Sequence, residues 1–388
     1  MHAILTATRR MIAAAGTLAA LGLWAAPGAN AQTIKIGVIT DNTGRAAFYA
    51  KPVTQGTILG AKEINAKGGL LGQKIELLIE DDNAKPDISA TKARKLVDAG
   101  VVAIISNSSS PATQQAQTVT LAAKTPHITP ANSSDWLTKK LNNPYFFQLG
   151  PLGSIQIRTL MAYAKAKNLQ RVAIVGDNSG LGKIIAKVFR GALEKSGIKV
   201  VAEQIVPIGS RTAVPQMQKV RAARPEAIFQ AGIVGPQMVQ FFRAYHQLGM
   251  KQPIMGSFNL SIPAYLITAK GLMDGVAFID AYDPDKSRTK DFIALYKNEY
   301  GKTPFSLPGY GYDGIQFVAD AIRRAGSADR EEVRKAMAEP KEWVGVMGAK
   351  GASITLSDGK RAGFDVNGAV VRVIQNNQHG PVVHSGVK

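Results

Sequence analysis

Short apolar runs alternate along the chain with longer segments in which apolar residues recur every three or four positions. Thr33–Thr40 is apolar and β-branched, which predicts a buried strand, and Pro52–Ala66 carries Ile58, Leu59 and Ile64 at helical spacing. The same alternation predicts strands over Lys74–Glu80, Val101–Ile105 and His127–Thr129, and helices over Pro86–Ala99 and Pro111–Ala123. Strands that alternate with helices of this length indicate βαβ units and a parallel sheet.

After the break at Gly150-Pro151-Leu152-Gly153 the pattern starts again. Helices are predicted over Ile155–Lys167, Leu181–Ser196, Pro215–Ala223 and Pro236–Leu248, and strands over Arg171–Val175, Lys199–Val206, Ala227–Gln230, Pro253–Met255 and Gly275–Ile279. Three further helices (Lys290–Tyr300, Tyr312–Ala325, Asp329–Ala338) precede an antiparallel tail over Ser353–Leu356 and Gly368–Ile374, with a turn at Asp358-Gly359.

The predicted fold is therefore α/β, with two Rossmann-like lobes that each contain a parallel sheet. We expect an N-terminal lobe of residues 32–148 plus 281–345 and a C-terminal lobe of residues 149–280 plus 346–388. The chain would cross between the lobes three times. Such a hinge would make a cleft that can close.

The extreme N-terminus predicts a secretory signal peptide over residues 1–31. Arg9 and Arg10 precede the apolar stretch Met11–Ala26, and Ala29-Asn30-Ala31 has the small-x-small pattern of a cleavage site after Ala31. The chain contains no cysteine, so it has neither a disulfide nor the acylated cysteine of a lipoprotein. We expect an exported, soluble protein of the periplasm.

The net charge of +19 changes this picture little, because lysine and arginine are spread along the chain without a basic run. No nucleic-acid partner is expected, although the charge favours anionic ligands.

Catalytic motifs such as H-E-x-x-H and G-x-S-x-G are absent from the sequence. Gly309–Gly314 matches G-x-G-x-x-G, but the preceding Pro308 indicates a loop before a helix, and Asp81-Asp82-Asn83 is typical of solvated turn acids. We therefore expect a binding protein, not an enzyme, without cofactor or metal.

One stretch suggests where a ligand would bind. Ser106–Thr113 is rich in hydroxyl groups and leads from a strand into a helix, with Ser110 as the expected N-cap and Pro111 at the first helical position. A helix N-terminus with free hydroxyls and N–H groups can hold a carboxylate. The alternative is an ordinary polar turn without a ligand. Ser133-Ser134-Asp135 predicts a second helix start that would point at the same anion.

Six motifs resemble those of a known family. They are Ile34–Val38, Gly60–Gly72, Ile79–Asp82, Ile128–Ala131, Tyr312–Gly314 and Ala319–Ile322. In this order they resemble the type I periplasmic solute-binding proteins of ABC importers, specifically the branched-chain amino-acid-binding group. The resemblance implies a monomer of two lobes that closes on one small ligand and presents it to ABC permease subunits in the inner membrane.

The same resemblance implies a set of ligand-binding residues. The carboxylate contacts of the family fall on Ser109, Ser110 and the second turn of Ala131, Asn132 and Ser133, and its first-loop aromatic residue falls on Tyr49. Departures occur in the second half of the site. Leu152 and Phe258 stand where amino-acid binders hold the ligand ammonium with two acids, and Leu181 stands where they have a tyrosine. We therefore expect a small carboxylate with an aromatic or apolar body. Asn259 or Asp313 could still supply a polar partner.

Other functions stay open at this point. An amino-acid ligand is one alternative, and a ligand sensor for a membrane receptor is another. An exported enzyme with an unrecognised site is the third.

Overall fold

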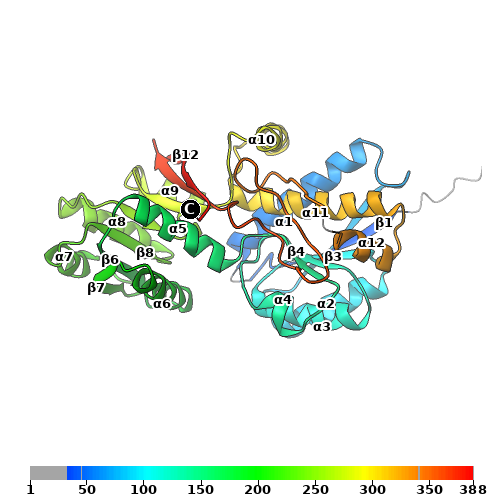
Figure 1. The fold of residues 1–388 in the computed structure, drawn as a ribbon, viewed down its shortest axis with the longest axis horizontal. Coiled ribbons are helices and arrows are strands. Elements are labelled where there is room, and N and C mark those ends of the chain that lie inside the picture. The colour runs from blue at the N-terminus through cyan, green and yellow to red at the C-terminus, as the bar shows by residue number, and fades with distance from the viewer. Residues whose placement is uncertain (1–32, 45, 340, 388) are drawn as a thin grey trace, which may run out of the picture. The chain divides into compact units, whose positions relative to one another are not determined.

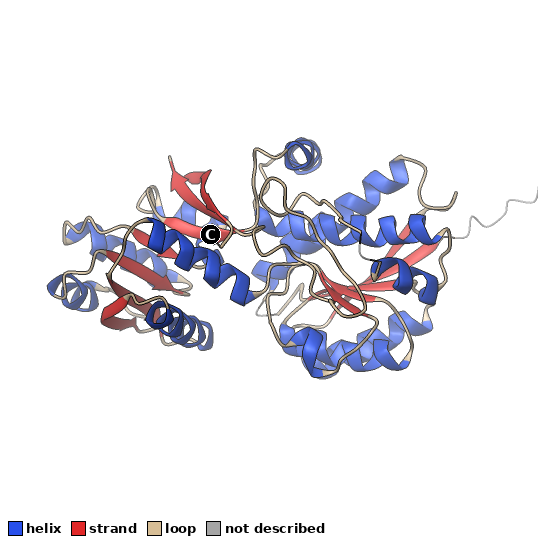
Figure 2. Cartoon of the chain, viewed as in Figure 1, coloured by secondary structure: helices blue, strands red, loops and turns tan. Residues whose placement is uncertain are grey.

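The computed structural model describes residues 33–44, 46–339 and 341–387 (Figures 1 and 2). The predicted signal peptide lies outside these residues. Within the described ranges, every helix is too short or too polar to cross a bilayer.

The first sheet has five parallel strands in the order β2-β1-β3-β4-β5. They are β1 (Ile34–Thr40), β2 (Ile75–Asp81), β3 (Ala103–Asn107), β4 (His127–Thr129) and β5 (Phe146–Gln148). One face is covered by α1 (Ala47–Ala66) and α11 (Ser306–Ala325), and the other by α2 (Pro86–Asp98) and α3 (Ser110–Ala122) (Figure 1). The short strand β5 and the single-turn helix α4 (Leu137–Lys140) were not predicted.

Three late helices return to the first core: α10 (Ser287–Tyr300), α11 and α12 (Arg330–Met337). α11 begins six residues before the predicted Tyr312, so the glycines of Gly309–Gly314 lie inside a helix and the predicted loop is wrong. Their role is close packing. A Cβ at Gly311 would lie 1.7 Å from the Val53 carbonyl oxygen of α1, and one at Gly56 would lie 1.8 Å from the Pro308 oxygen.

The second sheet has seven strands in the order β12-β11-β10-β9-β8-β6-β7, parallel except for the hairpin β11–β12. They are β6 (Arg171–Asp177), β7 (Lys199–Val206), β8 (Ala227–Ala231), β9 (Ile254–Gly256), β10 (Ala277–Asp280), β11 (Val370–Gln375) and β12 (Gln378–Ser385). One face packs against α5 (Gly153–Ala166) and α6 (Gly180–Lys195), and the other against α7 (Val214–Ala222), α8 (Pro236–Gln247) and α9 (Pro263–Ala269). A 3-10 turn, η1 (Phe258–Ser261), follows β9.

The tail differs in part from its prediction. The turn at Asp358-Gly359 is present, because Ser357 and Lys360 exchange two backbone hydrogen bonds of 3.0 Å. The strand predicted over Gly368–Ile374 corresponds to β11, but it pairs with β10 and with β12, which was not predicted. The edge position of β12 explains why Pro381 is tolerated there.

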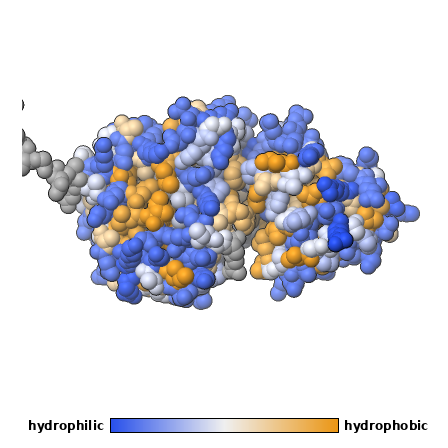
Figure 3. Space-filling model, turned by 180° about the vertical axis from the view of Figure 1, so that it is seen from behind, coloured by the Kyte–Doolittle hydropathy of each residue, from blue (hydrophilic) through white to orange (hydrophobic). Residues whose placement is uncertain are grey.

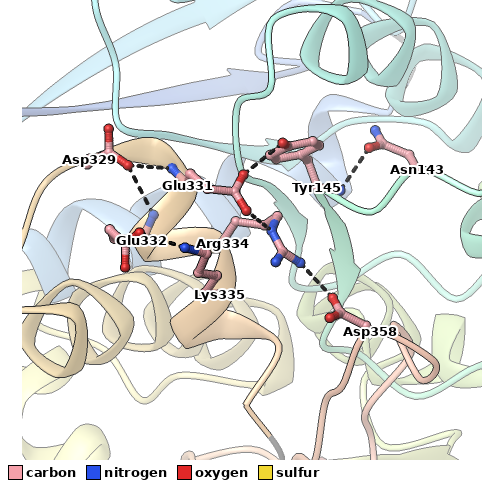
Figure 4. A network of polar contacts seen from close by, with 8 residues as sticks. All are labelled: Asn143, Tyr145, Asp329, Glu331, Glu332, Arg334, Lys335 and Asp358. Carbon is pink, nitrogen blue, oxygen red and sulfur yellow. Dashed lines mark hydrogen bonds and ion pairs between the residues drawn. The ribbon is translucent and has the colours of Figure 1, made fainter.

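The segment between α12 and β11 is fastened to the first core. Val346, Ile354 and Phe364 are buried in the same cluster as α1 and α11. Figure 4 shows the polar part of this contact, in which Arg334 of α12 bonds both Glu331 and, at 2.6 Å, Asp358 of the returning segment. The lobe boundary expected at residue 345 stays a prediction, and these contacts favour a later one, after Phe364.

Candidate functional site

The serine-rich turn after β3 begins a helix, but one residue earlier than predicted. Ser109 has extended backbone angles (φ −63°, ψ 154°) and is the N-cap, whereas Ser110 is the first helical residue and Pro111 the second. The expectation of Ser110 as the N-cap is therefore wrong. The second predicted helix start is also wrong, since Ser133–Asp135 are not helical and α4 is a single turn that begins at Leu137.

The hydroxyls of this turn do not converge on one point. Ser106 bonds the buried His127 at 2.6 Å, Ser108 donates to Asp82 at 2.7 Å, and Ser109 donates to the Ala84 carbonyl at 3.3 Å. Burial lowers the pKa of His127 to about 3, so this imidazole is neutral at ordinary pH. The turn is thus largely satisfied within the first lobe.

Two acidic residues singled out in the sequence are part of the interior. Asp82, expected as a solvated acid, is fully buried, and burial raises its pKa. Asp313, considered as a ligand partner, is also buried, and it accepts hydrogen bonds from the backbone N–H groups of Val346 (2.8 Å) and Met347 (2.9 Å). Asp313 therefore holds the returning segment against α11.

Side chains from both lobes meet in a small cavity of about 30 Å³. Its lining consists of Tyr49, Ala131, Ser133, Gln156, Phe258, Asp280, Ser306, Leu307 and Tyr310. Ala131 and Ser133 follow β4, Phe258 follows β9, and Asp280 ends β10. The cavity therefore lies at the carboxyl ends of the strands, the edge where open α/β sheets bind ligands.

The apolar part of the cavity is aromatic. The rings of Tyr49 and Phe258 meet edge to face, with centroids 6.3 Å apart, and so join α1 to the second sheet. The Tyr49 hydroxyl donates to the Ala131 carbonyl at 2.5 Å, and burial raises the pKa of this phenol above its usual value. Tyr49 was expected in a loop before a helix that starts at Pro52, but α1 begins at Ala47 and places it in the first turn.

A buried ion pair forms part of the cavity wall. Asp280 lies 3.4 Å from the guanidinium of Arg372 on β11, and both side chains are 3% exposed. The Asp280 carboxylate also accepts from the Ala281 N–H at 2.8 Å. Burial raises the pKa of Asp280, while Arg372 opposes that shift. Of the pair, Asp280 lines the cavity and Arg372 does not, so the carboxylate is the charged group that faces a ligand.

Four of the ten predicted site residues line this cavity: Tyr49, Ala131, Ser133 and Phe258. The other six, Ser109, Ser110, Asn132, Leu152, Leu181 and Asn259, lie outside its lining. Ser110 is close to the cavity, because its hydroxyl bonds Asn132 (3.0 Å) and Ser134 (2.6 Å) of the turn that contains Ser133.

Three of the residues outside the cavity lining have other environments. Leu152 is the N-cap of α5 and packs against the α5–α6 core, and Leu181 is 38% exposed on α6. Asn259 is buried, bonds Ser257 and donates to the Ile233 carbonyl at 3.0 Å. Its amide therefore stabilises the turn after β9.

The cavity is also lined by five residues that were not among the predicted site residues: Gln156, Asp280, Ser306, Leu307 and Tyr310. Asp280 had a usable signal, since an acid directly follows the predicted strand Gly275–Ile279. Ser306 had none, because its helix was predicted to start at Tyr312.

Comparison with known proteins gives a consistent result. A family model described as periplasmic binding protein matches residues 33–376. The chain is 28% identical to the Leu/Ile/Val-binding protein BraC3 of Rhizobium johnstonii over 82% of this chain and 86% of that protein. It is 26% identical to a leucine-, isoleucine-, valine-, threonine-, and alanine-binding protein of Pseudomonas aeruginosa, over 79% of this chain and 82% of that one.

Solved structures share the fold. The branched-chain amino acid substrate-binding protein LivJ of Streptococcus pneumoniae, in complex with isoleucine, superposes with a TM-score of 0.76 at 24% identity, over 91% of this chain and 100% of that chain. A solute-binding protein of Rhodopseudomonas palustris, in complex with 3,4-dihydroxy benzoic acid, gives 0.74 at 23% identity, over 91% and 97%. At these identities the likeness concerns the fold alone.

Proposed function

The chain belongs to the periplasmic binding protein family, and from this premise we propose that it closes on a small carboxylate with an aromatic or apolar body, as the extracytoplasmic solute-binding subunit of an ABC importer. The observation that carries the ligand class is the lining of the cavity. Tyr49, Phe258, Leu307 and Tyr310 converge on one place from α1, η1 and α11. The partner would be a membrane permease.

Closure around an apolar ring would stabilise the complex mainly through burial. A pair of aromatic rings adds about 0.5–1.5 kcal/mol beyond the burial of its area. The present cavity has room for little more than one water molecule. The ligand therefore enters when the lobes separate, and Tyr49 and Phe258 then close on opposite sides of it.

The polar groups of the cavity would orient the ligand. Ser133 and Gln156 can donate hydrogen bonds to a carboxylate, whereas Asp280 would repel it. We therefore place the ligand carboxylate toward Ser133 and Gln156, and the opposite end of the ligand toward Asp280.

A second candidate ligand is a branched-chain or other amino acid. Asp280 favours it, because a carboxylate in the cavity can accept hydrogen bonds from an ammonium group that would otherwise be costly to bury. The relatives named for leucine, isoleucine and valine keep this alternative open for the present chain.

Thermal unfolding with a panel of ligands separates the two. Chain refolded from denaturant, to remove any bound ligand, is heated with benzoate, a phenylpropenoate, 3,4-dihydroxybenzoate, leucine, isoleucine or valine. A ligand at a hundredfold excess over its dissociation constant stabilises the fold by about 2.7 kcal/mol. Stabilisation by the aromatic acids supports the proposal. Stabilisation by leucine or valine alone would overturn the aromatic class and leave the solute-binding function.

The transport role is tested separately. Deletion of the gene for this chain should abolish uptake of the stabilising compound by the living cell. Normal uptake, together with loss of a cellular response to the compound, would instead indicate a ligand sensor for a membrane receptor.

A further inference from the structure

The exposed face of α6 carries an ordered set of apolar residues. The face drawn in Figure 3 is largely polar with apolar patches in several places, and some apolar exposure is normal for a folded protein. On α6 the exposed apolar residues form one row. Leu181, Ile184 and Val188 follow one another at spacings of three and four residues, and they are 38%, 63% and 44% exposed. Such spacing forms one stripe along a helix.

A basic row runs beside this apolar stripe. Lys183 and Lys187 are exposed, lie four residues apart and so share a second stripe of the same helix. Arg190 continues the row and forms an ion pair with Glu203 of β7. The two lysines have no ion-pair partner in the described part of the chain.

The edge strand β7 extends the same surface. The Arg190–Glu203 ion pair joins α6 to this strand, whose next exposed apolar residue is Ile205. Beyond it, Ile208 is 56% exposed, and its backbone N–H donates at 2.9 Å to the Asn178 side chain just before α6. We call the residues Leu181, Lys183, Ile184, Lys187, Val188, Ile205 and Ile208 the α6 surface.

We propose that the α6 surface binds the surface of an anionic lipid bilayer. Exposed aliphatic side chains can enter the boundary between headgroups and acyl chains, while adjacent lysines contact anionic headgroups. A second copy of the chain is a poor occupant, because Lys183 and Lys187 would face their own counterparts. The binding would be peripheral and reversible, and it does not depend on which solute the cavity takes.

The lysines set the expected size of the effect. A basic residue near an anionic membrane contributes about 1 kcal/mol, so removal of two should weaken binding about thirtyfold. The attraction is screened by salt, and binding should therefore fall as the ionic strength rises.

The test is co-sedimentation of the chain from Gln32 onward, without the predicted signal peptide, with vesicles of phosphatidylcholine, with or without phosphatidylglycerol. We expect binding only to the vesicles with phosphatidylglycerol, and loss of it in Lys183→Gln/Lys187→Gln. A matched control is Lys290→Gln/Lys297→Gln on α10, which removes the same charge from another exposed helix and should bind as the unmodified chain does. Ile184→Gln/Val188→Gln should also weaken binding, with an unchanged midpoint of thermal unfolding.

Three outcomes would overturn the proposal. The first is failure to bind phosphatidylglycerol vesicles. The second is equal weakening by the α10 control pair, which would show attraction by net charge alone. The third is that the chain binds soluble polyglutamate but not vesicles, and that Lys183→Gln/Lys187→Gln weakens this binding. Such a result would indicate an acidic protein as the partner.

Discussion

Replacement of Gly311 by alanine tests the close packing between α1 and α11, two helices whose residues line the cavity. Gly311 lies in α11, whose first residues Ser306 and Tyr310 line the cavity, and it faces Val53 of α1, the helix that carries Tyr49. The new Cβ would lie 1.7 Å from the Val53 carbonyl oxygen and 2.9 Å from the Thr57 nitrogen. Both are backbone atoms, so neither can move away by a change of rotamer.

The magnitude follows from two opposed effects. Alanine is favoured over glycine inside a helix by about 1 kcal/mol. Overpacking costs about 1–3 kcal/mol when side chains can yield, and more when they cannot. Ordinary contact distances would require the helices to separate by roughly 1.5 Å or more. We therefore expect Gly311→Ala to lower the free energy of unfolding by at least about 2 kcal/mol, and to weaken ligand binding.

Urea denaturation measures the change, and α6 supplies the control. Gly191 also lies inside a helix, but a Cβ there would meet nothing within 4 Å. Gly191→Ala should therefore raise the free energy of unfolding by about 0.5–1 kcal/mol. If Gly311→Ala were as stabilising as Gly191→Ala, the close crossing of α1 and α11 would be refuted.

Three further predictions concern the returning segment and the cavity. Burial raises the pKa of Asp313 to about 6, so its contribution to stability should grow by about 1 kcal/mol as pH falls from 7 to 5, and urea denaturation of Asp313→Asn should lack this gain. Phe258→Ala should weaken binding of the aromatic ligand about tenfold or more in calorimetry, whereas Leu181→Ala should leave it unchanged, since Leu181 lies outside the cavity. Because Asp358 is largely exposed, Asp358→Ala should cost less than about 1 kcal/mol in thermal unfolding, and Arg334→Ala, which also removes packing over Tyr145, should cost more.

The sequence predicts the α/β fold well because, in most elements, the spacing of the apolar residues agrees with the residues that the structure buries. The strands buried on both faces, such as β1 and β3, read as continuous apolar runs. Helix starts were harder to predict. Pro52 indicated the first position of α1, yet it lies in the second turn, where one backbone hydrogen bond is lost. The glycines of α11 indicated a loop, although tertiary contact with α1 requires them inside a helix.

Of the residues that the family resemblance implied, Tyr49, Ala131 and Ser133 line the cavity. Their contact with a ligand stays a prediction. The hydroxyls before α3 do not converge on one point as predicted, because two of them bond Asp82 and His127. The local sequence pattern does not reveal these partners. Likewise, the pairing of Asp280 with Arg372 joins residues far apart in the chain, so no local pattern could show it.

The buried pair of Asp280 and Arg372 limits which group of a ligand can lie beside Asp280. Two like charges about 4 Å apart interact by about 4 kcal/mol near a protein surface, so a ligand carboxylate beside Asp280 would be strongly disfavoured. A hydroxyl there would instead donate a hydrogen bond to a charged group, which contributes about 1.5–3 kcal/mol. On the proposed function, a benzoate with a hydroxyl opposite its carboxylate should therefore bind at least about tenfold more tightly than benzoate. Equal affinities in calorimetry would show that Asp280 faces Arg372 alone and does not contact the ligand.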